Sequence, residues 1–227
     1  MPDVHTASYA ALLLLHVLLF VYWLGADLAV LYSAHYAANP ALSAETRSTI
    51  SDIMAFVDMF PRLSVPLIGA VGVQLAVLGG YAAFPAWAVF AAWALALTWA
   101  GNGLFIFRRR RAPASIQSAR RVDLVLRLVV LACLVAVVAS SLAGAGPVGS
   151  PFLIVKLLAL AAAIILSLLL RITFAPFRPA LNRIIGGAGG AEDSMIMQRS
   201  LARSRPVVFC LWGTALVGAA AGVWGGR

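Results

Sequence analysis

The sequence predicts an all-α, polytopic membrane helix bundle of about six transmembrane helices, on the basis of its composition and its apolar blocks. Of its 227 residues, 63% are hydrophobic and 11% are charged, whereas a soluble domain carries about a quarter charged residues. The mean hydropathy is +0.96. The apolar residues form blocks of about twenty, long enough to cross a hydrocarbon layer roughly 30 Å thick. We therefore expect a multi-pass protein of the cell inner membrane, with the lipid bilayer as its main partner.

Proline, glycine and arginine residues set the expected bounds of each helix. The first apolar block lacks a basic leader and is too long for a cleavable signal, so it is expected to be retained. Ser43 is a predicted N-cap for an amphipathic helix over residues 43–60, which should lie along the interface and be separated by Pro61 from the second span. Pro206 should begin the last span. One domain, 1–227, then contains spans at about 8–34, 63–79, 86–107, 122–145, 151–174 and 206–224.

The net charge of +9 reports orientation in the membrane rather than a nucleic-acid partner. Sixteen arginines and one lysine make up the basic residues, and most lie in two connectors, 108–121 and 171–205. Basic connectors stay on the cytoplasmic side of a membrane. With an even number of spans, both termini are therefore predicted to be outside, and nucleic acid is excluded as a partner.

The two cysteines provide no disulfide framework. Cys133 and Cys210 both lie inside apolar blocks. We expect them to be packed thiols, because free cysteine is usually a buried residue.

His16 is the first of few ionisable residues within the spans, where each charge costs about 2.5–3.5 kcal/mol or more. A neutral imidazole at membrane depth can bind haem iron or copper. Phe20, Trp23 and Asp27 follow at spacings that place all four on one helix face. The alternative is a histidine that holds the bundle together by a hydrogen bond to a neighbouring helix.

Lys156 is the only lysine in the sequence and lies inside the fifth span. That span runs parallel to the first, so Lys156 should reach a depth close to that of His16. A desolvated lysine can lose its proton, which suits proton transfer, iron ligation or capture of an anion. The alternative is a lysine whose amine extends to water at the outer interface.

Acidic residues near the cytoplasmic side are expected to form ion pairs. Asp27 should pair with Arg62, which lowers the cost of burying both; a proton relay at Asp27 is the alternative. Asp58 lies four residues before Arg62 and competes for the same pairing. Asp123 and Arg127 are also four apart and should form an ordinary helix pair.

Several residues together resemble the membrane protoporphyrinogen IX oxidase family called HemJ, and its looser relatives among CopD-like membrane domains. They are His16 with Trp23 and Gly25, His35 at the end of that helix, Arg62 to Pro66, Lys156 in its apolar block, and Pro206. The matched positions cover spans one, two, five and six. Spans three and four form an additional hairpin, and the histidine that often follows the lysine helix in that family is missing.

The resemblance implies a haem b bound within the bundle. His16 would be an axial ligand of the iron, Phe20 and Trp23 would flank the ring, and Lys156 would be an essential catalytic partner. The implied reaction is oxidation of protoporphyrinogen IX, or a similar porphyrinogen, to the porphyrin. Electrons would pass to the respiratory chain or a quinone. The sequence leaves both a single chain and a homo-oligomer as alternatives.

Two other functions compete with this hypothesis. A copper-handling role of the CopD-like type has His5, His16, Met195 and Met197 as its soft-metal donors, which form no single cluster in the sequence. A non-catalytic anchor subunit would use a packing seam on the third span, where small residues permit close helix contacts. The residues of that seam are Trp87, Trp93, Trp99, Gly101 and Gly103.

Overall fold

The computed structural model of the chain describes residues 7–110 and 116–225, and every regular element within them is an α-helix. The all-α prediction is therefore confirmed. The helices are α1 Ala7–Ala37, α2 Ala44–Val57, α3 Met59–Leu78, α4 Ala86–Arg108, α5 Gln117–Leu142, α6 Pro151–Phe174, α7 Phe177–Ile185 and α8 Ala191–Gly225.

Within the described residues, six helical segments are long and apolar enough to cross a membrane, which confirms a multi-pass membrane protein. The last of them differs from the prediction. Pro206 does not begin the span but lies inside α8, which is continuous over 35 residues. A proline can sit inside a membrane helix when neighbouring groups compensate for the missing N–H. Here buried side chains on both sides of Pro206 hold α8 against its neighbours.

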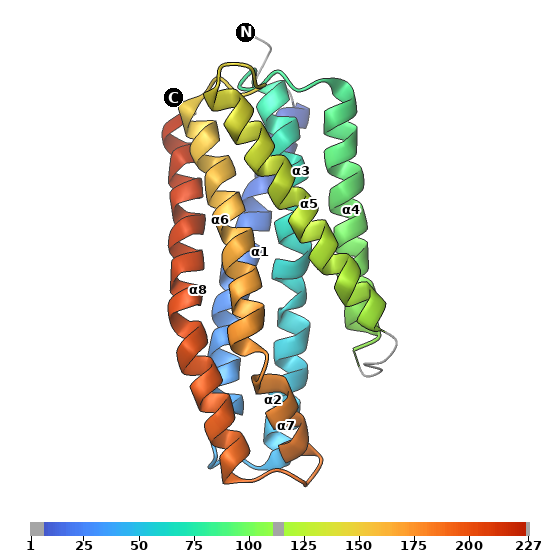
Figure 1. Cartoon of the computed structure of the whole chain (residues 1–227), viewed down its shortest axis with the longest axis vertical. Helices are drawn as coiled ribbons and strands as arrows, with labels where there is room; N and C mark the ends of the chain where they lie inside the picture. Colours follow the sequence, from blue (N-terminus) through green and yellow to red (C-terminus); the bar gives the residue numbers. More distant parts are fainter. Residues whose placement is uncertain (1–6, 111–115, 226–227) are drawn as a thin grey trace.

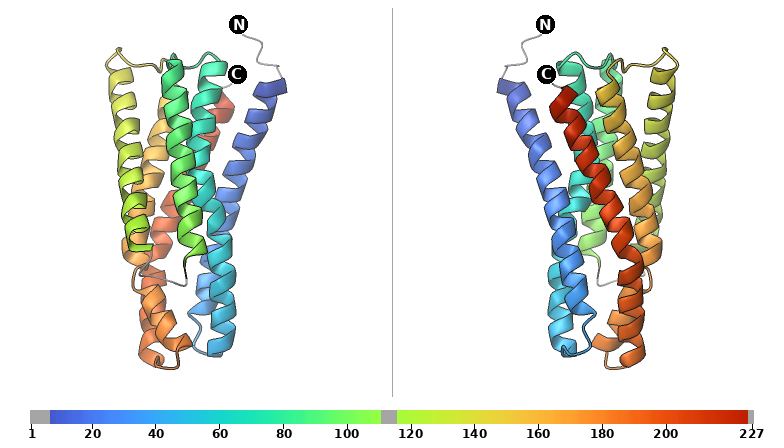
Figure 2. Two further views of the ribbon diagram at one scale, coloured as in Figure 1. Left: turned by 90° about the vertical axis from the view of Figure 1, so that its right-hand side faces the viewer. Right: turned by 90° about the vertical axis from the view of Figure 1, so that its left-hand side faces the viewer.

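The predicted interfacial helix is present, but its orientation is different. Ser43 caps α2 as expected, accepting a hydrogen bond from the Thr46 N–H at 3.2 Å. However, α2 continues into α3 through Asp58, whose backbone stays in the helical region, and the two form one long rod (Figure 2). The interruption falls at Asp58 because Pro61 has no N–H to offer the Val57 carbonyl.

The helices pack as two groups (Figure 1). One contains α1 to α4, where α3 lies between α1 and α4; the other pairs α6 with α8 along most of their length. At the end away from the termini, α2 and α7 join α1 and α8 around a core centred on Phe177, Leu181 and Met197. Toward the opposite end, α1 leans away from α8 (Figure 2). The two groups therefore meet more closely at one end than at the other.

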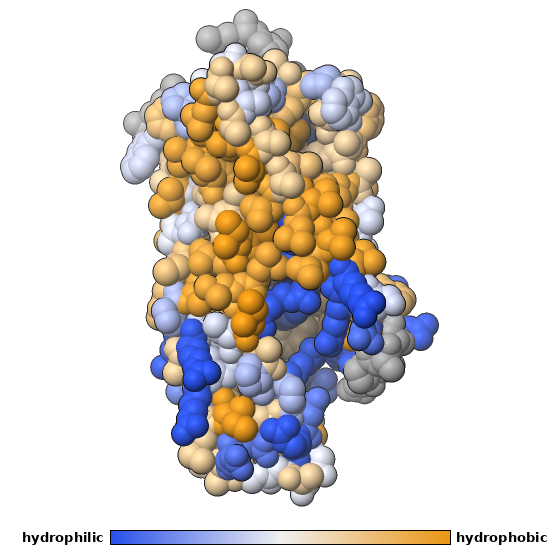
Figure 3. Space-filling view, viewed as in Figure 1, coloured by the Kyte–Doolittle hydropathy of each residue, from blue (hydrophilic) through white to orange (hydrophobic). Residues whose placement is uncertain are grey.

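The surface shows which part of the molecule faces lipid. A broad apolar belt covers the upper part in Figure 3, and hydrophilic residues concentrate below it. A helix of 35 residues such as α8 is about 52 Å long at 1.5 Å per residue, so it extends beyond a core of about 30 Å. Cys133 and Cys210 are exposed on this surface, so the expectation that they are packed thiols is wrong. They lie on apolar helices, whose outward residues face lipid without needing protein contacts.

Candidate functional site

His16 points from α1 toward α3 and has an unsatisfied buried nitrogen. Its Nδ1 is buried and has no hydrogen-bond partner. The ring packs on Gly72 of α3, where an added Cβ would lie 3.3 Å from its Cε1 atom. Buried polar atoms normally find a partner, so the Nδ1 atom of His16 is a candidate donor for a ligand.

Lys156 lies on α6 and is directed at α8. An added Cβ at Gly222 would be 2.9 Å from its Nζ atom, so the missing side chain of Gly222 leaves the space that the amine occupies. Lys156 is half-buried. Among the described residues, its amine has no hydrogen bond or ion pair. A half-buried amine without a partner is costly inside an apolar span and points to a functional role.

The charge of Lys156 acts on the His16 imidazole, so the two side chains lie in the same part of the bundle. Their common depth in the membrane stays a prediction. The two side chains come from α1 and α6, one from each packing group, and each of them faces a glycine on the helix beside it. This arrangement offers two nitrogen donors, an imidazole and a primary amine, in one apolar region.

Phe20 and Trp23 lie on the face of α1 that contains His16. Trp23 is 6% exposed and packs with Ala163, Leu211 and Ala215, so it fills the space between α1, α6 and α8. Phe20 contacts this cluster and also the cluster that α1 forms with α3. These aromatic side chains form the apolar floor below His16, on the side of the bundle centre.

The predicted Asp27–Arg62 ion pair is not formed. Arg62 instead donates from Nε to Asp58 at 2.7 Å, one helical turn earlier on the same rod. The i, i+4 geometry is available without any movement of another helix, which favours Asp58 over Asp27. Asp27 lies one turn after Trp23 on α1 and close enough to feel the charge of Asp58.

The Asp123–Arg127 pair is confirmed, but it belongs to a larger network than the sequence predicted. Asp123 also accepts from the Trp99 indole at 2.9 Å and from Arg171 at 2.7 Å. Arg127 donates from Nε to Asp123 at 3.1 Å and from Nη1 to Ser167 at 2.7 Å. This network joins α4, α5 and α6, and Asp123 is 5% exposed at its centre.

The predicted tryptophan seam on α4 is divided. Trp99 is buried in the network with Asp123, and Trp93 donates to Gln74 of α3 at 2.7 Å. Trp87 is 72% exposed. Steps of six residues rotate around a helix rather than along one face, so these side chains cannot form a single seam.

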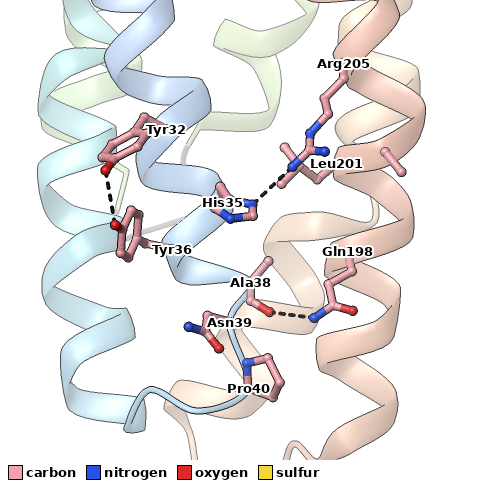
Figure 4. Close-up of a pocket in the computed structure, with 10 residues that line it drawn as sticks. Tyr32, His35, Tyr36, Ala38, Asn39, Pro40, Gln198, Leu201 and Arg205 are labelled. Carbon is pink, nitrogen blue, oxygen red and sulfur yellow. Dashed lines mark hydrogen bonds between the residues drawn. The ribbon is translucent and has the colours of Figure 1, made fainter.

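A cavity of about 660 Å³ lies at the lower end of α1 and α8. Figure 4 shows His35 pointing across it to Arg205, with 3.1 Å between His35 Nδ1 and Arg205 Nη2. A guanidinium can only donate, so Nδ1 accepts and the His35 proton lies on Nε2. Tyr32 and Tyr36 line the same cavity with their hydroxyls 3.1 Å apart. His35 therefore has a partner of its own and is separate from His16.

The donors proposed for copper do not meet. Met197 is fully buried in the lower core, while Met195 is 47% exposed. Ala34 packs in the same core as Met197 and lies eighteen positions after His16 on α1. Met197 and His16 are therefore separated by about 27 Å of helix. His5 lies outside the described residues. No group of three or more His, Cys, Asp or Glu side chains within the described residues could hold a metal ion.

The unpartnered Nδ1 atom of His16 and the amine of Lys156 are nitrogen groups that could serve as ligand donors, and each side chain packs against a glycine. Gly72 and Gly222 were not identified from the sequence; the spacing of Gly218 and Gly222, a small-xxx-small pattern, is the signal that could have indicated close packing there. Comparison with protein-family models, curated proteins and solved structures finds no match to this chain.

Proposed function

We propose that this chain is a haem-b-binding oxidoreductase of the cell inner membrane, with its redox site at His16 and Lys156. The observation that supports the proposal most directly is the buried, unpartnered Nδ1 atom of His16, on which the charge of Lys156 acts from a second span. Unsatisfied nitrogen groups within apolar spans cost stability, so a protein retains them where a ligand completes them.

His16 would hold the iron, and Lys156 would supply either a second nitrogen donor or a cation for a carboxylate group. When bound, the haem supplies one-electron redox chemistry. Lys156 orients or protonates an anionic substrate group, because a desolvated amine can change its protonation state. Phe20 and Trp23 exclude water from the region below His16, since both pack in apolar clusters.

The substrate in this proposal is a porphyrinogen and the electron acceptor a respiratory-chain component or quinone. Both rest on the resemblance of the sequence to the HemJ family. The structure supports the proposal with the nitrogen groups of His16 and Lys156 and with the apolar helices that contain them. Oxidation of protoporphyrinogen IX removes six electrons and six protons, so it needs an acceptor able to cycle repeatedly.

The absorption spectrum of the purified protein tests the proposal. Protein produced with ample haem should show a Soret band, and His16→Ala should remove it while leaving the protein inserted. His35→Ala is the matched control, because His35 lies on the same helix but in the separate lower cavity. Protein without haem, or a normal spectrum for His16→Ala, would contradict the proposal; stoichiometric copper in place of haem would favour the copper function.

A further inference from the structure

A hydrophilic hollow opens below the apolar belt, between the lower end of α5 and the region of α6 and α7 (Figure 3). Arginines from four helices and the end of a fifth lie near one another in this part of the molecule. They are Arg62 on α3, Arg110 after α4, Arg120 and Arg127 on α5, Arg171 on α6 and Arg178 on α7. Their fields act on one another: Arg178 senses Arg62, Arg120 and Arg110, and Arg127 senses Arg171 and Arg62.

Arg62 and Arg178 remain accessible to solvent. Of the Arg62 side chain, 39% is exposed. The Arg178 side chain is also exposed, while desolvation first and the charge of Arg62 second lower its pKa. An anion can therefore reach both guanidinium groups.

The acidic residues near the hollow do not neutralise it. Asp58 pairs with Arg62, Asp123 is shared by Arg127 and Arg171, and Asp52 lies 3.5 Å from Arg110. Asp27 is the fourth nearby carboxylate. Six arginines against four aspartates leave an excess of two positive charges.

Arg120 and Arg178 account for this excess. Within residues 7–110 and 116–225, neither has a hydrogen bond or an ion pair. Arg178 projects from α7 beside Phe177, which is fully buried and fixes that helix against the bundle. Its guanidinium therefore lies near like charges, and Asp58, the opposite charge that also acts on it, is already paired with Arg62.

We propose that this hollow binds an anion that carries a phosphate group, with Arg178 and Arg120 as its main ligands. Planar guanidinium groups match phosphate oxygens in bidentate geometry, and a phosphate would neutralise the excess charge. The hollow adjoins the lower edge of the apolar belt, so the phosphate could belong to a lipid headgroup or to a soluble anion. Binding here does not depend on haem at His16.

Thermal unfolding of the purified full chain in a neutral detergent tests this site. The added probes are potassium phosphate, phosphatidylglycerol, and potassium chloride at matched ionic strength. A bound ligand raises the unfolding temperature in proportion to the logarithm of its concentration above Kd. Stabilisation by phosphate beyond chloride would assign a soluble anion, and stabilisation by phosphatidylglycerol alone would assign a headgroup.

Arginine variants show whether the hollow is responsible. Arg178→Gln should weaken the effective probe by about tenfold, as expected for one lost charge-assisted interaction, and Arg120→Gln should weaken it further in the double variant. Arg203→Gln is the matched control, because Arg203 is an exposed arginine on α8 outside this cluster. No stabilisation beyond chloride by either probe, or unchanged binding by Arg178→Gln, would overturn the proposal.

Discussion

The amine of Lys156 occupies the space that a side chain at Gly222 would fill. An added Cβ there would lie 2.9 Å from Nζ and 3.5 Å from Cε. One turn nearer the end of the same helix contact, Gly225 faces Phe152. Lys156 is thus one turn inside the α6–α8 contact, and its direction toward α8 follows from the absence of a side chain at position 222.

Gly222→Ala should displace the Lys156 amine with little effect on folding. The atom that must move is the free end of a flexible side chain, and alanine favours a helix over glycine by about 1 kcal/mol. We expect the thermal unfolding temperature in detergent to stay the same or rise. The proposed oxidase activity should fall by about a hundredfold, a typical cost of misplacing a catalytic group by about 1 Å.

Gly213→Ala is the control for this substitution. Gly213 lies on the same helix, and an added Cβ there meets no atom within 4 Å. It should leave both activity and unfolding temperature near those of the wild type. Equal losses in the two alanine variants would show that the Lys156 position is unimportant.

Gly72→Ala should disturb His16 in the same manner. The new Cβ would lie 3.3 Å from the ring Cε1, so the imidazole must shift by a few tenths of an ångström. The Soret band should weaken or change position, because the axial ligand moves. Gly69→Ala on the same helix, with its nearest contact at 3.7 Å to Leu160, should leave the spectrum intact. A wild-type spectrum for Gly72→Ala would separate His16 from the haem.

Composition and apolar blocks were sufficient to predict the helical class and six spans, because the stretch of each helix that crosses the lipid must be apolar. The ends of the helices were less predictable. Pro206 is a helix-start signal in isolation, yet in α8 the packing of buried residues on both sides continues the helix through it. Local propensity was overridden there by tertiary contacts.

The ion pairs also depend on tertiary contacts that the sequence does not show. Asp58 and Arg62 are neighbours on any helix that continues through Pro61, and the structure confirms that i, i+4 pairing. Asp27 required a contact between helices, which sequence spacing alone cannot establish. His16 and Lys156 were predicted to lie at a similar depth, whereas the glycines opposite them depend on helix rotation and could not be predicted.

Asp123→Asn should destabilise the protein strongly. The Asp123 side chain is 7% exposed and holds two arginines from α5 and α6. Removing one member of a buried charge network costs about 3–5 kcal/mol, because the remaining charges stay buried without a partner. A large fall in thermal unfolding temperature in detergent is expected.

Asp58→Asn provides the comparison for that loss. It also breaks an arginine pair, but the Asp58 side chain is 35% exposed, and such pairs contribute about 0–1 kcal/mol. Its unfolding temperature should stay close to that of the wild type. Comparable destabilisation by the two variants would mean that the Asp123 network carries no special weight.

The orientation of the bundle is predicted from its arginines. The described ends of α1 and α8 lie at the same end of the molecule (Figure 1), and the positive-inside rule places the opposite, arginine-rich end in the cytoplasm. Reporter fusions active only in the cytoplasm should give signal near Gly189 and none at Gly146. Fusions after Arg111 and Arg227, which lie outside the described residues, should be active and silent respectively. The reverse pattern would invert the topology.

Lys156→Met tests whether the amine serves chemistry or merely reaches toward water. Methionine is similar in length and apolar, so the half-buried site should accept it and the protein should fold at least as well as the wild type. The measurement is rescue of a bacterial strain that lacks its own protoporphyrinogen oxidase. The wild-type chain should restore growth and Lys156→Met should fail, although it still binds haem through His16. Full rescue by Lys156→Met would show a lysine without a catalytic role, and failure of the haem-loaded wild type would remove the porphyrinogen as substrate.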